Sequence, residues 1–254
     1  MSLTQPALNN FSIPSPFQEK AKTAPPLELA TAPSVSVVIA AMNEELNLPH
    51  VLPLIPTWVD EIIIVDGGST DDTVTVAQGL CPNVVIVHQT GKGKGDALRL
   101  GFEAATKDII VALDADGSTA PQEIPVFVGA LVSGADYVKG SRFLQGGGTA
   151  DMTLLRRLGN LGLVKLVTLF YGENFSDLCY GYNAFWRKSL PALALDVDGF
   201  EIETLMNIRA IKANLRVAEV ASFESERIHG ESNLQTFKDG WRVLKTIIRE
   251  KVQA

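Results

Sequence analysis

The sequence predicts an α/β fold in which a mostly parallel central sheet carries helices on both faces. Short apolar runs alternate along the chain with longer segments of helical periodicity, the order typical of doubly wound sheets. The runs are rich in valine and isoleucine, which favours strands buried on both faces over half-exposed hairpins. The composition agrees, because 46% hydrophobic and 20% charged residues among 254 are ordinary globular values.

The first half of the chain accounts for most of the expected sheet. Strands are expected at Val35–Ala41, Glu61–Val65, Val84–Val87 and Ile109–Leu113. Helices are expected at 45–57, 71–80, 93–106 and 121–133. For the second helix, Ser69 or Thr70 is the expected N-cap, and Asp71 and Asp72 fall in the first turn, where acidic side chains favour a helix.

Beyond Tyr137 the pattern is less regular. Residues 145–150 (QGGGTA) predict a glycine-rich loop that can move, and 177–188 is a mixed segment. Helices are expected over 153–171, 201–213 and 233–253, with a short strand over 216–221. The stretch 153–171 fits either a core helix or a helix at a membrane interface, because basic residues interrupt its apolar sequence.

Composition also indicates the compartment in which the protein is expected and the partners that it disfavours. Residues 1–33 are rich in proline, and we expect a disordered extension ahead of one folded domain at 34–254. The sequence shows neither signal-peptide character nor an apolar run long enough for a membrane span, so the expected compartment is the cytoplasm. Cys81 and Cys179 lie far apart, which favours neither a disulfide framework nor a zinc site. A formal charge of −7 argues against nucleic acid as a partner.

Acidic residues follow the predicted strands at the points where the strands end. Asn43-Glu44-Glu45 lies at the end of the first strand, Asp66 follows the second, and Asp114-Ala115-Asp116 follows the fourth. One such turn alone is explained by a helix cap, but several would place carboxylates along one rim, where open α/β sheets bind ligands. Asp114 and Asp116 can point to the same side of an extended segment. Such a pair suits Mg²⁺ or Mn²⁺ bound together with substrate phosphates.

Glycines and lysines alternate over Gly91–Gly95. This segment is either a phosphate-binding loop ahead of a helix or a turn with solvated lysines. Its spacing matches neither the Walker motif nor the dinucleotide-binding motif, which disfavours an NTPase and a dehydrogenase.

Taken together, these segments resemble the successive motifs of glycosyltransferase family 2. The resemblance covers residues 34–120 and is carried by SVVIAAMNEE, IIIVDGGSTDDT, GKGKGDALRLG and ALDADG. Later segments are similar to the dolichol-phosphate mannose synthase and polyprenyl-phosphate sugar transferase branch. They are GSRF at 140–143, the arginines at 156–157, SDLCYGYNAFWR at 176–187, FEIE at 200–203 and ERIHGESNL at 226–234. Two positions depart from that branch, which often has glutamine at Ser118 and lysine at Asn233.

The resemblance implies a GT-A fold, an inverting transfer from a GDP- or UDP-sugar, and a bound Mg²⁺ or Mn²⁺. Peripheral contact with the cytosolic face of a membrane and a homodimer are further expectations. The implied donor-binding residues in the first half are Ala40, Asn43, Glu45, Asp66, Lys94, Asp114 and Ala115. Those in the second half are Arg142, Arg156, Arg227, His229 and Ser232. Asp114, Asp116 and His229 are the implied metal ligands, and Asp116 also counts among the catalytic residues.

The acceptor decides whether a base is needed. A polyprenyl phosphate is already an anion and needs cations to hold it, for which Arg142, Arg156 and Arg157 are suited. A soluble hydroxyl acceptor, such as a glycan or a small metabolite, needs a carboxylate base, for which Glu203 and Asp177 are the catalytic candidates. A binding module for nucleotide-sugars without catalysis is the third alternative, and the intact pair of aspartates speaks against it.

Overall fold

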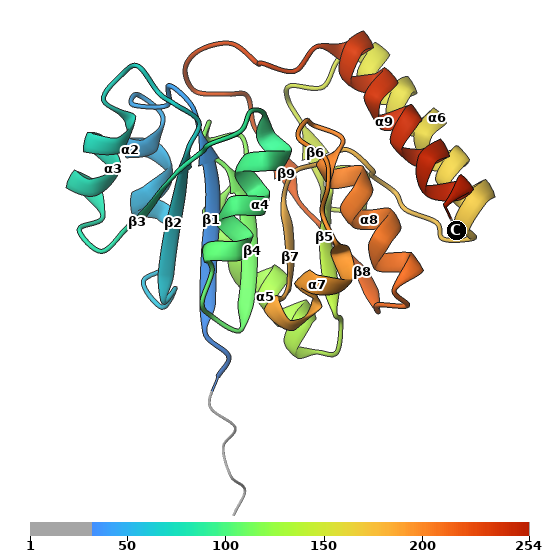
Figure 1. Cartoon of the computed structure of the whole chain (residues 1–254), viewed down its shortest axis with the longest axis horizontal. Helices are drawn as coiled ribbons and strands as arrows, with labels where there is room; N and C mark the ends of the chain where they lie inside the picture. The colour runs from blue at the N-terminus through green and yellow to red at the C-terminus, as the bar shows by residue number, and fades with distance from the viewer. Residues whose placement is uncertain (1–31, 254) are drawn as a thin grey trace, which may run out of the picture. The chain divides into compact units, whose positions relative to one another are not determined.

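The computed structural model describes residues 32–253 and contains a seven-stranded mixed sheet (Figure 1). The predicted disordered extension therefore lies almost wholly outside the described residues. The strands follow the order β3-β2-β1-β4-β7-β5-β8, and only β7 runs antiparallel to its neighbours. Their bounds are β1 Val35–Ala41, β2 Glu61–Asp66, β3 Val85–His88, β4 Ile109–Asp114, β5 Tyr137–Ser141, β7 Asn183–Trp186 and β8 Val217–Ala221. The predicted α/β fold with a mostly parallel sheet is confirmed.

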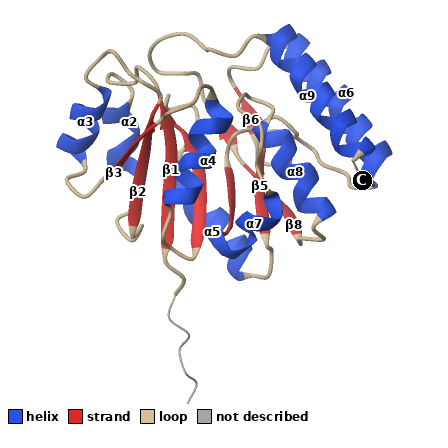
Figure 2. Ribbon diagram, in the orientation of Figure 1, coloured by secondary structure: helices blue, strands red, loops and turns tan. Residues whose placement is uncertain are grey.

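Helices cover both faces of this sheet (Figure 2). One face packs against α2 (Leu48–Val51), α3 (Thr73–Leu80) and α5 (Ile124–Val132). The other packs against α4 (Lys94–Ala104), α7 (Leu190–Leu193) and α8 (Ile202–Lys212). An outer pair, α6 (Leu154–Tyr171) and α9 (Thr236–Val252), packs together and against α8. A second, two-stranded sheet pairs β6 (Gly148–Thr149) with β9 (Phe223–Glu224).

The apolar strands fill both layers of the core, as their sequence predicts. Along β1, Val37 and Ile39 point into the layer of α2, α3 and α5, whereas Val38 points into the layer of α4 and α8. Helix α4 lies very close to the sheet at Gly101, where a Cβ atom would stand 2.4 Å from a methyl group of Val38. This close packing fixes the later part of α4, the helix that begins at Lys94, against the face of the sheet.

The expected helix at 45–57 is wrong. Only α2 and a single 3₁₀ turn at Leu52–Leu54 form there. Pro49, Pro53 and Pro56 interrupt the segment, and each lacks the N–H group that a continuing helix requires. The segment instead becomes a tight connection at the end of β1.

The expected cap of α3 is also wrong. The helix begins at Thr73, whose N–H donates to the Asp71 carboxylate at 3.0 Å. Ser69 and Thr70 instead contact Asn43, through Asn43 N–H to Ser69 Oγ at 2.9 Å and Thr70 N–H to Asn43 Oδ1 at 2.8 Å. These polar residues therefore fasten the loop after β2 to the loop after β1.

The second half of the chain contains strands that the sequence pattern did not reveal. The mixed segment 177–188 contains β7, and the glycine-rich loop 145–150 contains β6, which is paired with β9. Strand β5 has the sequence YVKGS, in which lysine, glycine and serine obscure the apolar pattern of a buried strand. None of the helices in residues 32–253 is long and apolar enough to cross a membrane.

Candidate active site

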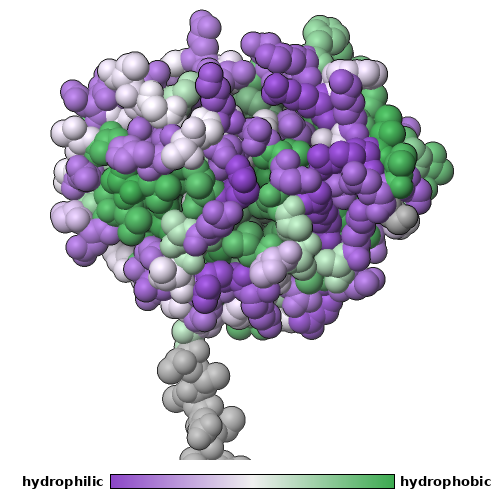
Figure 3. Space-filling view, viewed as in Figure 1, coloured by the Kyte–Doolittle hydropathy of each residue, from purple (hydrophilic) through white to green (hydrophobic). Residues whose placement is uncertain are grey.

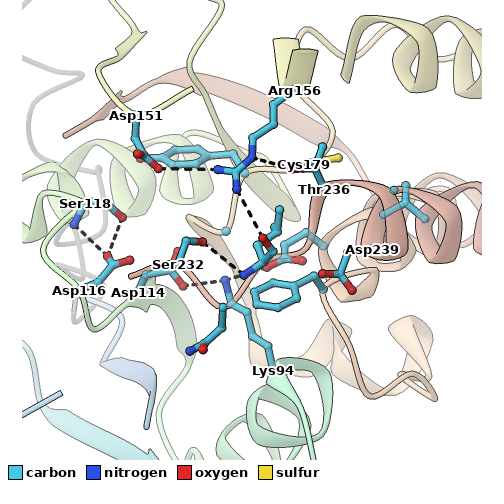
Figure 4. A pocket seen from close by; sticks show the side chains of 18 of the residues that line it. Lys94, Asp114, Asp116, Ser118, Asp151, Arg156, Cys179, Ser232, Thr236 and Asp239 are labelled. Atoms are coloured by element: carbon cyan, nitrogen blue, oxygen red, sulfur yellow. Dashed lines mark hydrogen bonds and ion pairs between the residues drawn. The ribbon is translucent and has the colours of Figure 1, made fainter. Parts of the chain in front are cut away.

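A cavity of about 1230 Å³ lies at one edge of the sheet (Figure 4). The carboxyl ends of β1, β4 and β5 meet there, and antiparallel β7 contributes its amino end at the same edge. Long helices α6 and α9 provide the opposite wall. The cavity brings together these predicted residues: Ala40, Lys94, Asp114, Ala115, Asp116, Arg142, Arg156, Glu203, Arg227 and Ser232.

Lys94 joins two carboxylates that are far apart in the sequence. Its Nζ lies 2.6 Å from Asp114 Oδ1 and 2.9 Å from Glu203 Oε1. Burial alone would lower the pKa of Lys94, but the two carboxylates outweigh it and raise the pKa above its ordinary value. Gly181 leaves room for this arrangement, because a Cβ atom there would stand 2.8 Å from Lys94 Nζ and 2.9 Å from Asp114 Oδ2.

The glycines around Lys94 have a structural explanation. The Gly95 N–H donates to the carbonyl of Asp198 at 2.9 Å, and a Cβ atom at Gly93 or Gly95 would collide with the backbone of Val197 and Asp198. Close packing against this loop therefore accounts for the glycines, while Lys92 and Lys94 line the cavity.

Asp116 is held from two sides. Its Oδ1 accepts hydrogen bonds from Ser118 N–H at 3.0 Å and Ser118 Oγ at 2.7 Å. Its Oδ2 forms an ion pair with Arg227 Nη2 at 2.9 Å, and Arg227 Nη1 also pairs with Glu44 Oε1 at 3.1 Å. Burial raises the pKa of Glu44 above its usual value, although Asn47 and Arg227 oppose this effect.

The sequence places Glu44 among the acidic residues of the rim, but it was not predicted as a site residue. It stands between the predicted residues Asn43 and Glu45, and only the fold shows which of the two adjacent glutamates faces the cavity. The one available signal was its place in the NEE segment after the first strand.

The pair of aspartates fits a hard divalent cation. Asp114 and Asp116 both line the cavity and offer carboxylate oxygens, the ligands that Mg²⁺ and Mn²⁺ prefer. Among the described residues, no three histidine, cysteine or acidic side chains gather into a metal-binding group. Such a cation would therefore need phosphate oxygens of a substrate, or water, to complete its coordination.

The structure does not bring His229 together with the two aspartates. His229 lines a smaller neighbouring cavity of about 280 Å³, and its ring lies 5.8 Å from that of His50. Its backbone is fixed by Asn47, whose Oδ1 accepts from His229 N–H at 2.9 Å and whose Nδ2 donates to the His229 carbonyl at 3.1 Å. A metal-binding role of His229 remains a prediction.

Three predicted donor-binding residues hold the rim loops in place. Asn43 and Glu45 line the smaller cavity, and Glu45 Oε2 accepts from Asp72 N–H at 2.9 Å. Asp66 lies outside the lining of both cavities and accepts from Ser69 N–H at 3.1 Å. Burial tends to raise the pKa of Asp66, but hydrogen bonds, from Ser69 above all, bring it below its ordinary value. That Asn43, Glu45 and Asp66 contact a nucleotide remains a prediction.

Arg142 is bound by two carboxylates. It donates to Asp177 through Nε at 2.7 Å and Nη2 at 2.9 Å, and to Glu224 through Nη1 at 2.9 Å. Asp177 is fully buried and lies outside the cavity lining. Burial would raise the pKa of Asp177, but the Arg142 guanidinium overcomes this effect and lowers it. Arg142 therefore lines the cavity while both of its carboxylate partners hold it in place. The buried Lys139 donates to the Tyr180 carbonyl at 3.1 Å.

Arg156 is held more loosely and reaches into the cavity from α6 (Figure 4). Its Nε donates to Thr236 Oγ1 at 3.3 Å, and its Nη1 lies 3.9 Å from Asp151 Oδ2. The surrounding wall is apolar, which sequence reasoning did not foresee. Its side chains from α6 and α9 include Leu155, Leu158, Leu163, Phe237, Trp241 and Leu244.

Several known proteins are similar to this chain in sequence or in fold. The glycosyl transferase family 2 model matches residues 36–193. The chain is 31% identical to glycosyltransferase AglJ of Haloferax volcanii, over 87% of this chain and 73% of that protein. It is also 31% identical to an undecaprenyl-phosphate mannosyltransferase of Micrococcus luteus, over 79% of this chain and 87% of that protein.

A solved structure is similar as well. It is glucosyl-3-phosphoglycerate synthase of Mycobacterium tuberculosis, in complex with Mn²⁺, uridine diphosphate and phosphoglyceric acid. The TM-score is 0.69 and the identity 25%, over 86% of this chain and 78% of that one. The likeness confirms the predicted GT-A-type fold. Since the family model covers more than half of the sequence, this chain belongs to glycosyltransferase family 2.

Proposed function

We propose that this glycosyltransferase moves a sugar, with inversion, from a nucleoside-diphosphate sugar to a polyprenyl phosphate, with the help of Mg²⁺ or Mn²⁺. The observation that carries the proposal is the two-sided cavity. One side presents the charged residues Lys94, Asp114 and Asp116, and the other is an apolar wall formed by α6 and α9. A charged donor and a lipid acceptor would each find a matching surface.

The charged side suits the donor. Asp114 and Asp116 would hold the divalent cation, and Lys94 and Arg227 would face the phosphates. When bound, the cation would neutralise the negative charge that gathers on the departing nucleoside diphosphate. Lys94 stays protonated between its two carboxylates. It would therefore offer a fixed positive charge close to the departing diphosphate.

The acceptor side favours a nucleophile that arrives ionised. An oxygen of the acceptor phosphate would attack the anomeric carbon opposite the diphosphate. The new carbon–oxygen bond would form as the bond to the diphosphate breaks. Glu203 is paired with Lys94, and Asp177 with Arg142, so both candidate bases are engaged by cations. Arg156 lines the cavity next to the apolar wall and would hold the acceptor phosphate by charge-assisted hydrogen bonds.

The outer helices α6 and α9 present a surface suited to an anionic membrane. Figure 3 shows hydrophobic side chains at the edge of the view where these helices lie. Helix α6 carries three basic and no acidic residues, and α9 carries five basic and two acidic residues, in a chain with a net charge of −7. The exposed large side chains are Leu154, Leu155, Leu158, Leu161, Leu169, Phe237, Trp241, Ile248 and Val252.

We therefore expect the protein to bind vesicles that contain anionic lipid and to bind less as salt rises. Each basic residue near an anionic membrane surface contributes about 1 kcal/mol to the free energy of membrane binding. Reversing Arg157 and Lys165 to glutamate should weaken binding by more than about tenfold in a sedimentation assay. The matched control is Arg187→Glu with Lys188→Glu, two exposed charges at the far end of β7. Equal binding by both double variants would contradict the membrane contact.

A soluble acceptor is the second candidate, because glucosyl-3-phosphoglycerate synthase shares the fold and was solved with phosphoglyceric acid. A donor screen separates the two. GDP- and UDP-sugars are supplied with Mg²⁺ or Mn²⁺, and nucleotide release is followed with a short-chain polyprenyl phosphate, with phosphoglyceric acid or with neither. We expect release to depend on the polyprenyl phosphate. Release that depends on phosphoglyceric acid alone would favour the second candidate, and binding of donor without any release would favour a binding module.

A further inference from the structure

The Arg227 guanidinium lies where a cation is expected. Asp116 Oδ1 accepts two hydrogen bonds from Ser118. Oδ2 is therefore the oxygen that remains available to a metal. Arg227 Nη2 lies 2.9 Å from this Oδ2. A guanidinium and a divalent cation on the same oxygen would repel each other strongly at such distances. The two therefore compete for Asp116.

The backbone next to Arg227 is fastened by contacts of its own. Ser225 N–H donates to the Ser118 carbonyl at 2.9 Å, and Ile228 N–H donates to the Asp116 carbonyl at 3.1 Å. Two further hydrogen bonds join His229 to Asn47. The arginine side chain can thus leave Asp116 by rotating about its own bonds, while the segment that carries it stays in place.

A second carboxylate keeps Arg227 at the site. Glu44 is buried and pairs with Nη1 of the same guanidinium at 3.1 Å. When the contact with Asp116 is lost, Glu44 still attracts the arginine, so that it stays within reach of the donor phosphates. The two carboxylates therefore have different tasks.

We propose that Arg227 is the counter-cation of Asp116 in the ligand-free protein and is exchanged for the divalent cation when the donor binds, with Glu44 retaining the displaced arginine. This inference rests on the metal-dependent function proposed above. Its consequence is that the metal alone binds weakly, because it must displace a positive charge. The diphosphate of the donor favours the exchange, since it offers Arg227 a new anionic partner.

The test measures Mn²⁺ binding to the whole protein without substrate, by calorimetry or by electron paramagnetic resonance of free Mn²⁺. Arg227→Ala should bind Mn²⁺ at least about tenfold more tightly than wild type, since a charge-assisted hydrogen bond no longer opposes it. Arg227→Lys keeps the charge and should stay near wild type. Arg187→Ala, an exposed arginine at the far end of β7, is the matched control. Uridine diphosphate should tighten Mn²⁺ binding more in wild type than in Arg227→Ala.

The outcomes separate this inference from the function on which it rests. If Arg227→Ala binds Mn²⁺ no more tightly than wild type, the exchange is overturned while the metal site stands. If Arg227→Lys gains as much affinity as Arg227→Ala, charge is not the cause and the exchange is again overturned. If Asp116→Ala binds Mn²⁺ as wild type does, or wild type binds none with or without uridine diphosphate, the proposed metal site fails and the exchange with it. Should Arg227→Ala not fold, Arg227→Gln takes its place.

Discussion

Replacing Asp116 with alanine is expected to lower the rate of sugar transfer by at least about 10²–10³-fold. The substitution removes a carboxylate from the charged side of the cavity, where the leaving diphosphate would gather negative charge. Asp116 belongs to the rim and not to the apolar core, so the melting temperature should change little. Initial rates at saturating donor and acceptor, together with a thermal melt, measure both effects.

The controls separate charge from structure. Asp116→Asn keeps the size of the side chain and an oxygen for the Ser118 hydrogen bonds, yet it should lose nearly as much activity. Asp198→Ala, whose side chain is 76% exposed and lies 3.9 Å from Arg99, should keep activity because Asp198 does not line the cavity. Full activity in Asp116→Ala, or in wild type with excess EDTA, would contradict the role of Asp116 in metal-assisted transfer.

Local sequence predicted the first half of the sheet well. Strand β1 was placed at its observed bounds, and β2, β3 and β4 within one residue, because apolar runs buried on both faces leave a clear pattern. The position of Asp114 and Asp116 at the rim could be predicted too, because they lie at the carboxyl end of a recognisable parallel strand. Over 45–57, where prolines interrupt the helical pattern, the prediction of a helix failed.

The partners of the charged residues could not be read from the sequence. Glu203 lies 109 positions from Lys94, and Asp177 lies 35 positions from Arg142. Neither separation follows a helical or strand repeat, so only the tertiary structure shows that these charges neutralise one another. Both carboxylates were candidate bases in the sequence, and both are paired with a cation in the fold.

The ion pair between Arg142 and Asp177 determines which arginine variant is suitable for testing the identity of the acceptor. Arg142 supports the fold, because its removal would leave the buried Asp177 carboxylate without its guanidinium partner, a defect that costs about 3–5 kcal/mol. Any loss of activity in such a variant would be confounded with unfolding. Arg156 is the better choice, because it lines the cavity and its hydrogen bonds are long.

If the acceptor is a polyprenyl phosphate, Arg156→Ala should raise the acceptor KM by about tenfold or more and leave the donor KM nearly unchanged. The reason is that a charge-assisted hydrogen bond contributes about 1.5–3 kcal/mol. Glu203→Gln should in contrast keep appreciable activity, since the nucleophile is already ionised and Lys94 remains paired with Asp114. The measurement is a full set of kcat and KM values for both substrates, for each variant and for Arg157→Ala, a neighbouring arginine outside the cavity lining.

A hydroxyl acceptor predicts the reverse order. Loss of a general base costs about 10²–10⁴-fold in rate, so Glu203→Gln would become the most damaging change, and Arg156→Ala would matter little.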